Sequence, residues 1–556
     1  MQTMKKLYSI FALLTLITIF SCQKNFLEEQ PLDFLSSTNA YVTAADFTLA
    51  VNDMYRVVRT EFYTRDENYP FDYLYGCDII YDGQPEPQRH SNMAAAYQPS
   101  GGQNIPLTHW SAFYKIISEA NAIIGRAPAS QMTPEQQLLA VAKGRFFRAF
   151  AYRSLVYLYG GVPIILEETS SPKTDFVRAT KAEVLNQCIE DLKFAAANLG
   201  AINAVQDGEV NSAAANHLLA EVYLAAGHFQ NAVDAASVVI NNSAVSLMKN
   251  RFGTKSTVTT GNVYWDLFQP GNQNRKSGNM ESLWVIQLET DVPGGAAVST
   301  QQAGNYLLER QHAPYLAQIT KVPNPFLHPV DDLTGGRGIG WAISTKYFSD
   351  VIWQSDFTND IRNANINFVR NFTSTNPASP LFGTVISTAN PPAGMTSPSR
   401  PFYPFQAKCT TPGGHPASLI QNPANGLMKA TAGGTFLDQY MFRLAETYLI
   451  RAEAYLGLNN NSSAAADINA VRSRSAAKDV AAGDVTIDYI LDERMREFGV
   501  EEKRRLTLMR LGLWYDRVVK CNPYYSDALP KYNLWPIPAD EIERNNTGKL
   551  TQNPGY

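Results

Sequence analysis

Acidic residues that stand close together in loops are the first candidates for chemistry in this sequence. Asp78 with Asp82, or Asp331 with Asp332, could supply the two carboxylates that flank a scissile glycosidic bond, about 5 to 9 Å apart. Acidic loop residues more often are solvated or form turns, and no feature sets one of these pairs apart. An exported glycoside hydrolase is therefore an alternative interpretation of the chain and not the main one.

Other catalytic signatures are missing from the sequence. There is no G-x-S-x-G motif, and "GGRGIG" (335–340) matches neither a P-loop nor G-x-G-x-x-G. The seven histidines form no H-E-x-x-H motif and no cluster with cysteines at metal-ligand spacing. The sequence thus predicts a protein that is not an enzyme, with no cofactor and no metal site.

Cys22 is the residue with the most specific chemical prediction. Lys5 and Lys6 precede a mostly apolar run, 7–20, which has the length of a secretory signal and is too short to span a bilayer comfortably. The run ends on Ser21 and Cys22, which resembles a bacterial lipobox, where the chain is cut before a cysteine that is then lipidated. An ordinary signal peptide with a chance cysteine is the alternative. Acyl chains on Cys22 would hold the mature protein stably on a membrane.

The other four cysteines show no disulfide framework. They are far apart in the chain, although export would permit disulfides, and we expect mostly buried free thiols. These cysteines are Cys77, Cys188, Cys409 and Cys521.

Composition limits the class of partner. The 556 residues carry 45% hydrophobic and 18% charged side chains, as in an ordinary globular protein, and the net charge of -4 gives no electrostatic footprint for nucleic acid. The mild excess is aromatic, with 28 Tyr, 27 Phe and 7 Trp. In an exported protein such side chains can fill the core or form platforms for sugars. Four tryptophans sit in regular apolar patterns and are expected in the core, namely Trp110, Trp265, Trp284 and Trp514.

Two helical blocks must position any site. They run from about 110 to 240 and from about 437 to 513. The segment 250–434 between them holds about half of the glycines and prolines, with short strand-like pieces such as "SLWVIQLE" (282–289). We interpret this segment as a large, loop-rich insertion carried on a helical scaffold.

The helical blocks contain a repeat. Ala220, Tyr223, Ala232 and Val239 have the same relative spacing as four residues of the second block. Those four are Ala452, Tyr455, Ala464 and Val471. Small residues at these positions let paired helices approach closely, which is the tetratricopeptide pattern. Because such helix pairs stack only on neighbours, the two units, 232 residues apart, are expected to meet in space with the insertion looped out.

Five ordered motifs, together with the lipobox and "NFLEEQPLD" (25–33), resemble one family. The motifs are "GRFFRAFAYRSLVYLYGGVPII" (144–165), "NSAAANHLLAEVYLAAGHFQNAVDAA" (211–236), "YMFRLAETYLIRAEAYL" (440–456), "ILDERMREFGVEEKRRLTLMRLG" (490–512) and "LWPIPADEIERNNTGKLTQNPGY" (534–556). They resemble the signatures of the SusD/RagB family of surface glycan-binding lipoproteins of Bacteroidota, along the whole mature chain.

The resemblance implies a mainly α fold, with a tetratricopeptide-like helical scaffold and a large, loop-rich, partly β insertion. It divides the chain into a signal peptide, a lipid anchor and tether, an N-terminal helical region, a ligand-binding insert, and a C-terminal helical region with a docked tail. The boundaries are 1–21, 22–45, 46–249, 250–436 and 437–556. Charged residues of the 490–512 motif, such as Arg494 and Glu497, have helical spacings that suit i,i+3 and i,i+4 ion pairs of the scaffold.

The resemblance also implies a function. A member of this family captures an oligosaccharide or polysaccharide at the outer membrane and delivers it to a SusC-like TonB-dependent barrel, without catalysis. A tetratricopeptide scaffold that binds proteins is a further alternative, although the long insert argues for more than that. In the family, ligand contacts come from two loop regions, which here are 73–89 and the insert. The residues expected to bind glycan are Asp78, Tyr81, Asp82, Tyr306, Arg310, His312 and Trp341.

Overall fold

The computed structural model describes residues 41–84, 90–101, 104–169, 171–290, 292, 294–296, 304–321, 323–328, 330–410 and 412–556. The expected signal peptide, Cys22 and most of the expected tether lie outside the described residues. Among the residues that are described, no helix is both long enough and apolar enough to cross a membrane.

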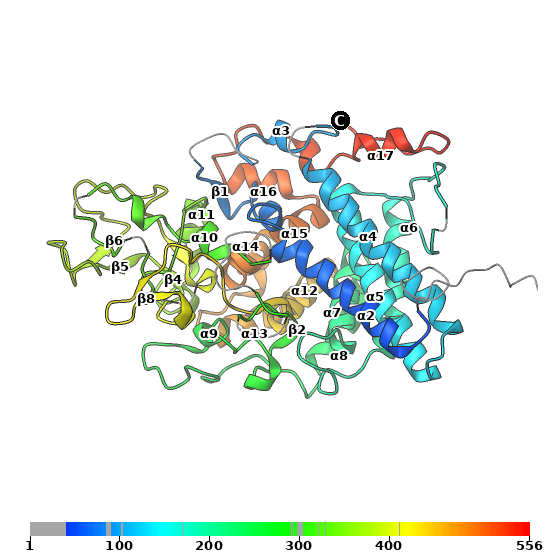
Figure 1. Cartoon of the computed structure of the whole chain (residues 1–556), viewed down its shortest axis with the longest axis horizontal. Helices are drawn as coiled ribbons and strands as arrows, with labels where there is room; N and C mark the ends of the chain where they lie inside the picture. Colours follow the sequence, from blue (N-terminus) through cyan, green and yellow to red (C-terminus); the bar gives the residue numbers. More distant parts are fainter. Residues whose placement is uncertain are drawn as a thin grey trace, which may run out of the picture.

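The N-terminal helices form a continuous stack. From α4 to α8 each helix packs against the next one along the chain, and α2 lies against α4 and α5 (Figure 1). Their bounds are α2 (Ala44–Arg59), α3 (Met93–Ala96), α4 (Ile105–Arg126), α5 (Pro134–Tyr159), α6 (Lys181–Asn198), α7 (Ser212–Ala225) and α8 (Phe229–Ile240).

Local sequence explains where the long helix α5 begins and ends. Thr133 caps its first turn, because its hydroxyl accepts from the backbone N–H of Gln136 while the Gln136 side chain accepts from the N–H of Thr133. The helix ends at Tyr159, and Gly160 follows with a positive φ of 75°, a conformation that glycine adopts without steric cost.

The C-terminal helices complete the same stack. Helix α12 packs on α8 and α7, and α13 packs on α12, so the two repeat units meet as the sequence predicts. The small residues Ala220 and Ala452 have no exposed surface, which permits this close approach. The bounds are α12 (Leu444–Gly457), α13 (Asn461–Arg474), α14 (Ile487–Glu497), α15 (Arg504–Leu511), α16 (Trp514–Cys521) and α17 (Ala539–Arg544).

The insertion lies at one side of the helical stack and consists of loops, short helices and short strand pairs (Figure 1). In the described residues every sheet is a two-stranded antiparallel ladder, with pairs β1–β3, β2–β10, β4–β7, β5–β6 and β8–β9. The elements are β1 (Ile80–Asp82), α9 (Val263–Asp266), β2 (Ser282–Ile286), α10 (Leu308–His312), β3 (Ala342–Ser344), α11 (Lys346–Ser349), β4 (Phe368–Val369), β5 (Asn371–Thr373), β6 (Val385–Ser387), β7 (Phe405–Gln406), β8 (Ile420–Asn422), β9 (Leu427–Met428) and β10 (Gln439–Arg443).

The last residues of the chain lie against the end of helix α5. Asn553 donates its two side-chain hydrogen bonds to the carbonyl oxygens of Tyr159 and Trp535, at 2.9 and 2.7 Å. Gln552 pairs with the backbone of Ile537 in both directions. The terminal segment is therefore held by buried backbone partners of the scaffold.

Candidate functional site

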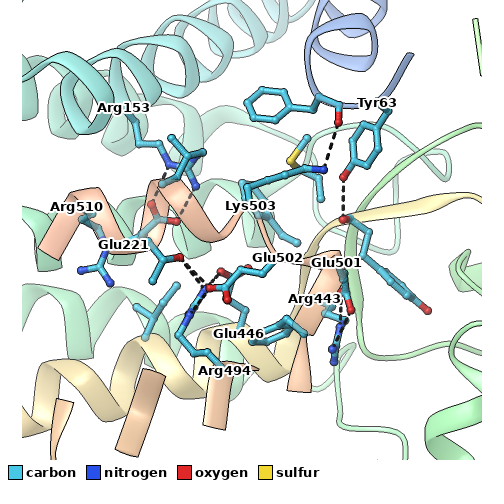
Figure 2. Close-up of a pocket in the computed structure, with 18 residues that line it drawn as sticks. Tyr63, Arg153, Glu221, Arg443, Glu446, Arg494, Glu501, Glu502, Lys503 and Arg510 are labelled. Atoms are coloured by element: carbon cyan, nitrogen blue, oxygen red, sulfur yellow. Dashed lines mark hydrogen bonds and ion pairs between the residues drawn. The ribbon is translucent and has the colours of Figure 1, made fainter. Parts of the chain in front are cut away.

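A charged chamber lies in the centre of the helical stack, but it is a structural network. Figure 2 shows its carboxylates and cations pointing at one another: Arg153 binds Glu221 at 2.8 Å, and Arg494 bridges Glu446 and Glu502. The cavity between them is about 50 Å³, while a water takes about 30 Å³ of liquid and ligand pockets have about 300–1,000 Å³. The chamber thus has no room for a sugar.

The same network corrects the expected ion pairing. Arg494 and Glu497 do pair within the scaffold, but their partners come mostly from other elements and not from one helical turn. Glu497 contacts Arg443 of strand β10 and Arg474 of helix α13, both buried. Charge spacing alone cannot reveal such partners, because helices brought together by the fold supply them.

The four cysteines of the described chain are free and buried, as the sequence predicts. His217, Glu221 and Glu446 place ligand atoms within 4.8 Å of one another, which is close enough to hold a cation. Arg153 and Arg494 already pair with these two carboxylates. Arginine charge rather than a metal ion therefore balances the acidic residues of this group.

Asp78 is not positioned to contact a ligand, which corrects the sequence expectation. Its carboxylate is fully buried and accepts from Arg504 at 2.7 and 2.8 Å and from Arg517 at 2.9 Å. Burial disfavours the charge, but the two guanidinium groups outweigh it and lower the pKa of Asp78 to about 2. Asp78 joins the insert-facing loop to helices α15 and α16.

Tyr306 and His312 are core residues as well, again against expectation. The Tyr306 ring stacks on Phe71 with 1% of its surface exposed. His312 is fully buried, with Nδ1 bonded to the carbonyl of Ala342 at 2.8 Å and Nε2 accepting from the N–H of Gln406. Burial lowers the pKa of His312 to about 4, so the imidazole is neutral near pH 7.

The remaining four expected residues are brought together by the ladder of β1 and β3. Tyr81 lies opposite Ile343, and the N–H of Gly83 donates to the carbonyl of Trp341 at 2.7 Å. Since side chains alternate along a strand, Trp341 lies on the same face of this ladder as Tyr81. The two loop regions that the resemblance implies thus meet in space.

Tyr81 is largely covered by another aromatic ring. Tyr524 stacks on it with ring centroids 3.6 Å apart and an angle of 13°, and Tyr524 itself is 52% exposed. The exposed aromatic surface at this point of the site is therefore that of Tyr524, which follows helix α16. No motif marked this residue, because its role depends on where the C-terminal segment folds.

Asp82 ends strand β1 beside this pair and is half-buried. Its backbone N–H donates to the hydroxyl of Tyr525 at 3.2 Å, and one carboxylate oxygen accepts from the N–H of Gln84 at 3.0 Å. Burial raises the pKa of Asp82 above its ordinary value. The following residues, 85–89, lie outside the described part of the chain.

Arg310 and Trp341 form the centre of the candidate site. The guanidinium carbon of Arg310 lies 5.6 Å from the centre of the Trp341 ring, within cation–π range, and Arg310 Nε donates to Glu67 at 3.1 Å. Both side chains are half-buried. Among the described residues, Arg310 Nη1 and Trp341 Nε1 have no hydrogen-bond partner. Both nitrogen atoms are buried, so a ligand on this surface would contact the exposed parts of the two side chains.

The glycine-rich turn before Trp341 is packed and not merely flexible. The N–H groups of Ile339, Gly340 and Trp341 donate to carbonyls of α10 and the residue after it, at 2.8 to 3.0 Å. Gly340 has φ +60°, and a Cβ there would lie 2.2 Å from the carbonyl oxygen of Arg400. Glycine is required at this position for the turn to approach so closely, and the turn fixes Trp341 relative to Arg310.

Sequence reasoning missed two further cations at this centre. Arg337 lies in the same turn and is half-buried, and Arg400 donates its Nε to the carbonyl of Ile339 at 2.8 Å while lying over the Tyr315 ring at 5.1 Å. The Arg337 side chain, too, has a buried donor, Nη1, without a partner in the described structure. Arg337 lies within the "GGRGIG" stretch (335–340), whereas Arg400 lies in a loop that no motif marked.

A second, open hollow of about 650 Å³ lies within the insert. Trp265 lines it and is half-exposed, which corrects the expectation that it belongs to the core, whereas Trp110, Trp284 and Trp514 are buried as expected. Arg251 and Lys255 lie over the Trp265 ring at 5.9 and 5.6 Å. This hollow is the alternative place for a ligand.

The acidic pair Asp331 and Asp332 has structural partners. Asp331 is buried and accepts from Thr375 and from the N–H of Leu333, and Asp332 binds His415. Both carboxylates thus organise the insert loops. The described structure gives the hydrolase alternative no pair of free facing carboxylates among the candidates.

Comparison with known proteins shows which proteins this chain is similar to. The family model described as "SusD family" matches residues 410–556, and the model described as "Starch-binding associating with outer membrane" matches residues 25–224. The chain is 25% identical over 569 aligned positions to SusD-like protein P2 of Formosa agariphila, covering 100% of both chains.

Solved structures share the fold. A SusD homologue from Bacteroides thetaiotaomicron has a TM-score of 0.68 at 18% identity, covering 94% of this chain and 99% of that one. A protein described as "Laminarin binding SusD-like protein" has a TM-score of 0.65 at 21% identity, covering 93% and 100%. The expected fold class, a mainly α scaffold with a partly β insertion, is confirmed. From the two family models at opposite ends of the chain and the full-length relative, we conclude that the chain belongs to the SusD/RagB family.

Proposed function

We propose that this protein binds an oligosaccharide or polysaccharide at the outer membrane and does not cleave it. The family model for its N-terminal part is described as starch-binding and outer-membrane-associated, and a structural neighbour is described as laminarin-binding. The single observation that carries the proposal for this chain is the centre formed by Arg310 and Trp341. There a partly exposed aromatic ring and a partly exposed guanidinium group lie against each other.

The chemistry of this centre suits a sugar. A pyranose presents apolar C–H groups on its faces and hydroxyl groups around its edge, so a binding site needs an aromatic surface beside planar polar groups. Trp341 and the exposed Tyr524 supply aromatic surface, and Arg310 supplies fork-shaped donors. A few placed polar groups within an apolar surface are what fix a small ligand's orientation.

The arrangement of the carboxylates supports binding without cleavage. Hydrolysis of a glycosidic bond needs an acid and a second carboxylate on either side of it. Near Trp341 the Glu67 carboxylate is paired with Arg310, and Asp78 is buried with two arginines. Among the expected acidic residues, Asp82 retains a buried oxygen without a partner in the described structure.

We further propose that Cys22 is lipidated, and that the protein faces outward and delivers its glycan to a SusC-like TonB-dependent barrel. The family membership and the lipobox motivate this proposal, and Cys22 lies outside the described residues. In this proposal residues 250–436 contribute most of the ligand surface, and the helical regions 46–249 and 437–556 hold it in place.

The binding proposal is tested with the full-length protein, extracted in detergent, against a panel of neutral and acidic polysaccharides. We expect retardation in affinity electrophoresis by at least one polysaccharide, with no new reducing ends after prolonged incubation. Release of reducing ends would show an enzyme. Absence of retardation across the panel, with correctly folded protein, would contradict glycan binding.

The anchor and the partner are tested together in the native host. We expect the wild-type protein in the outer-membrane fraction, accompanied by a barrel protein after mild detergent extraction, and Cys22→Ala in the soluble fraction. Ser21→Ala is the control, because it leaves the cysteine in place. Membrane retention of Cys22→Ala would exclude the lipid anchor, and a wild-type protein that is always recovered alone would exclude the stable complex.

A further inference from the structure

Three arginines from different segments meet at the turn that carries Trp341. Arg310 comes from helix α10, Arg337 from the glycine-rich turn, and Arg400 from the loop before β7. Arg310 lies over the Trp341 ring, and Arg400 lies over the Tyr315 ring. Burial lowers the pKa of both Arg337 and Arg400, and the positive charge of Arg310 lowers each further, as expected for like charges that are close together.

The described protein leaves this positive charge largely uncompensated. Glu67 is the carboxylate that pairs with Arg310, whereas Arg400 donates its Nε to a backbone carbonyl. The Arg337 guanidinium has no hydrogen bond or ion pair within the described chain. Three cations thus share one carboxylate partner.

The nearest buried acid, Glu309, does not neutralise them. One of its oxygens accepts from the backbone N–H of Arg337 at 2.9 Å, and the other binds His415 at 2.7 Å and Thr410 at 2.6 Å. Burial disfavours the imidazolium, yet Glu309 and Asp332 raise the pKa of His415 to about 9. Glu309 therefore shares the protonated His415 with Asp332 and forms no ion pair with the three arginines in the described structure.

Several arginines of the helical scaffold, in contrast, are paired with carboxylates. Arg148, Arg153 and Arg510 each face one carboxylate with two parallel hydrogen bonds of 2.7 to 2.9 Å. Desolvating a charge without a partner is costly, which is why buried charges are usually paired. Half-buried arginines with an unpartnered nitrogen also occur elsewhere, at Arg65, Arg145 and Arg370. What distinguishes the proposed glycan site is that three arginines from neighbouring segments have a single carboxylate partner among them.

We propose that this site takes acidic glycans, with a sugar carboxylate or sulfate ester bound by Arg310, Arg337 and Arg400 beside the Trp341 ring. The inference rests on the proposed glycan-binding function. A guanidinium group matches the two oxygens of a carboxylate or sulfate in its fork geometry, which a neutral hydroxyl does not.

The test compares each acidic polysaccharide with its own neutralised form, using the full-length protein and isothermal titration calorimetry. Polygalacturonate is paired with its methyl ester, and a sulfated galactan with its desulfated form, so that carboxylate and sulfate are distinguished. Laminarin, starch and xylan serve as neutral probes. We expect at least one acidic form to bind about tenfold or more tightly than its neutralised partner, and this binding to weaken as salt screens the charges.

The variant for this test is Arg337→Gln, because that side chain has no partner whose loss would unfold the protein. We expect it to weaken binding of the acidic form by about tenfold, which corresponds to the loss of one charge-assisted hydrogen bond. Arg145→Gln is the matched control, since Arg145 of helix α5 is half-buried, as Arg337 is, and also has a side-chain nitrogen without a partner in the described structure.

The possible results separate this inference from the proposed function. Binding of neutral probes with equal or weaker binding of acidic forms would overturn the inference and leave glycan binding intact. Acidic binding that is unchanged in Arg337→Gln would also overturn it, because another surface would then hold the anion. Failure to bind any probe would contradict both.

Discussion

At the scale of single residues, the same chemical groups serve two purposes that only their partners distinguish. The carboxylate of Asp78 is fully buried between Arg504 and Arg517, whereas the Arg337 side chain, with similar polarity, has no partner in the described chain. The first arrangement holds distant segments together. The second leaves a guanidinium group without a protein partner, and we propose that a ligand binds it. Sequence reasoning assigned Asp78 to the ligand because it stands in an aromatic-rich loop, and the two arginines that bury it lie over 400 positions away.

The burial of Asp78 gives a stability prediction. We expect Asp78→Asn to destabilise the protein by about 3–5 kcal/mol, because it leaves two buried guanidinium groups without their counter-charge. Since the folded-state pKa of Asp78 is about 2, below its unfolded value, this contribution is present above about pH 4 and is lost as the pH falls toward 2.

Urea unfolding of the wild type and the variant at pH 7 measures the difference. The control is Asp540→Asn, whose partner Arg544 is 70% exposed, and its effect should stay below about 1 kcal/mol. Equal, small effects for both variants would show that the buried pair does not stabilise the fold.

At the scale of elements, glycines set how closely segments approach. Gly160 and Gly161 end helix α5, and a Cβ on Gly161 would lie 2.0 Å from the carbonyl oxygen of Ala179. The chain next to Ala179 in turn contacts the C-terminal tail, since the N–H of Arg178 donates to the carbonyl of Lys549. Close packing therefore explains the two glycines of the "YGGVP" stretch. The same close approach positions the tail against the scaffold.

This contact predicts that Gly161→Ala costs about 1–3 kcal/mol, because backbone must shift to accept the methyl group. Gly125→Ala is the matched control: it lies near the end of helix α4 with open space around it, and alanine there should be neutral or stabilising by up to about 1 kcal/mol. The midpoint temperature of thermal unfolding, measured for the wild type and both variants, tests this prediction. A Gly161→Ala protein as stable as the wild type would mean that the two segments do not touch as described.

Elements differ in how far the sequence predicts them. The helices and their ends follow from apolar periodicity, caps and glycines, as at Thr133 and Gly160. The strand pair β1–β3 does not, because each strand has three residues and its partner lies in a different region of the chain. Short strands carry little pattern of their own, and their pairing depends on the fold as a whole. The candidate site rests on this pair, so its residues were only partly predictable.

At the scale of the whole molecule, a helical stack assembled from two distant parts of the chain holds a loop-rich insert at its side (Figure 1). The repeat spacing predicted that α8 and α12 would meet, because each helix pair can bury its apolar face only against a neighbour. The helical stack and the insert differ in how their arginines are paired with carboxylates. Inside the stack Arg153 and Arg510 are each matched by a carboxylate, whereas at the insert Arg310, Arg337 and Arg400 share a single one. The stack gives stability, and the insert has capacity for a ligand.

The most direct test of glycan binding at this site compares Trp341→Ala with Trp265→Ala on the polysaccharide that the wild type binds. Both are half-buried tryptophans next to cations, but they lie in the two competing places for a ligand. Affinity measured by calorimetry, with circular dichroism to verify folding, should fall about tenfold or more for Trp341→Ala, because an aromatic contact is lost. It should stay within about twofold of the wild type for Trp265→Ala. Full affinity in Trp341→Ala, or a loss confined to Trp265→Ala, would contradict the account.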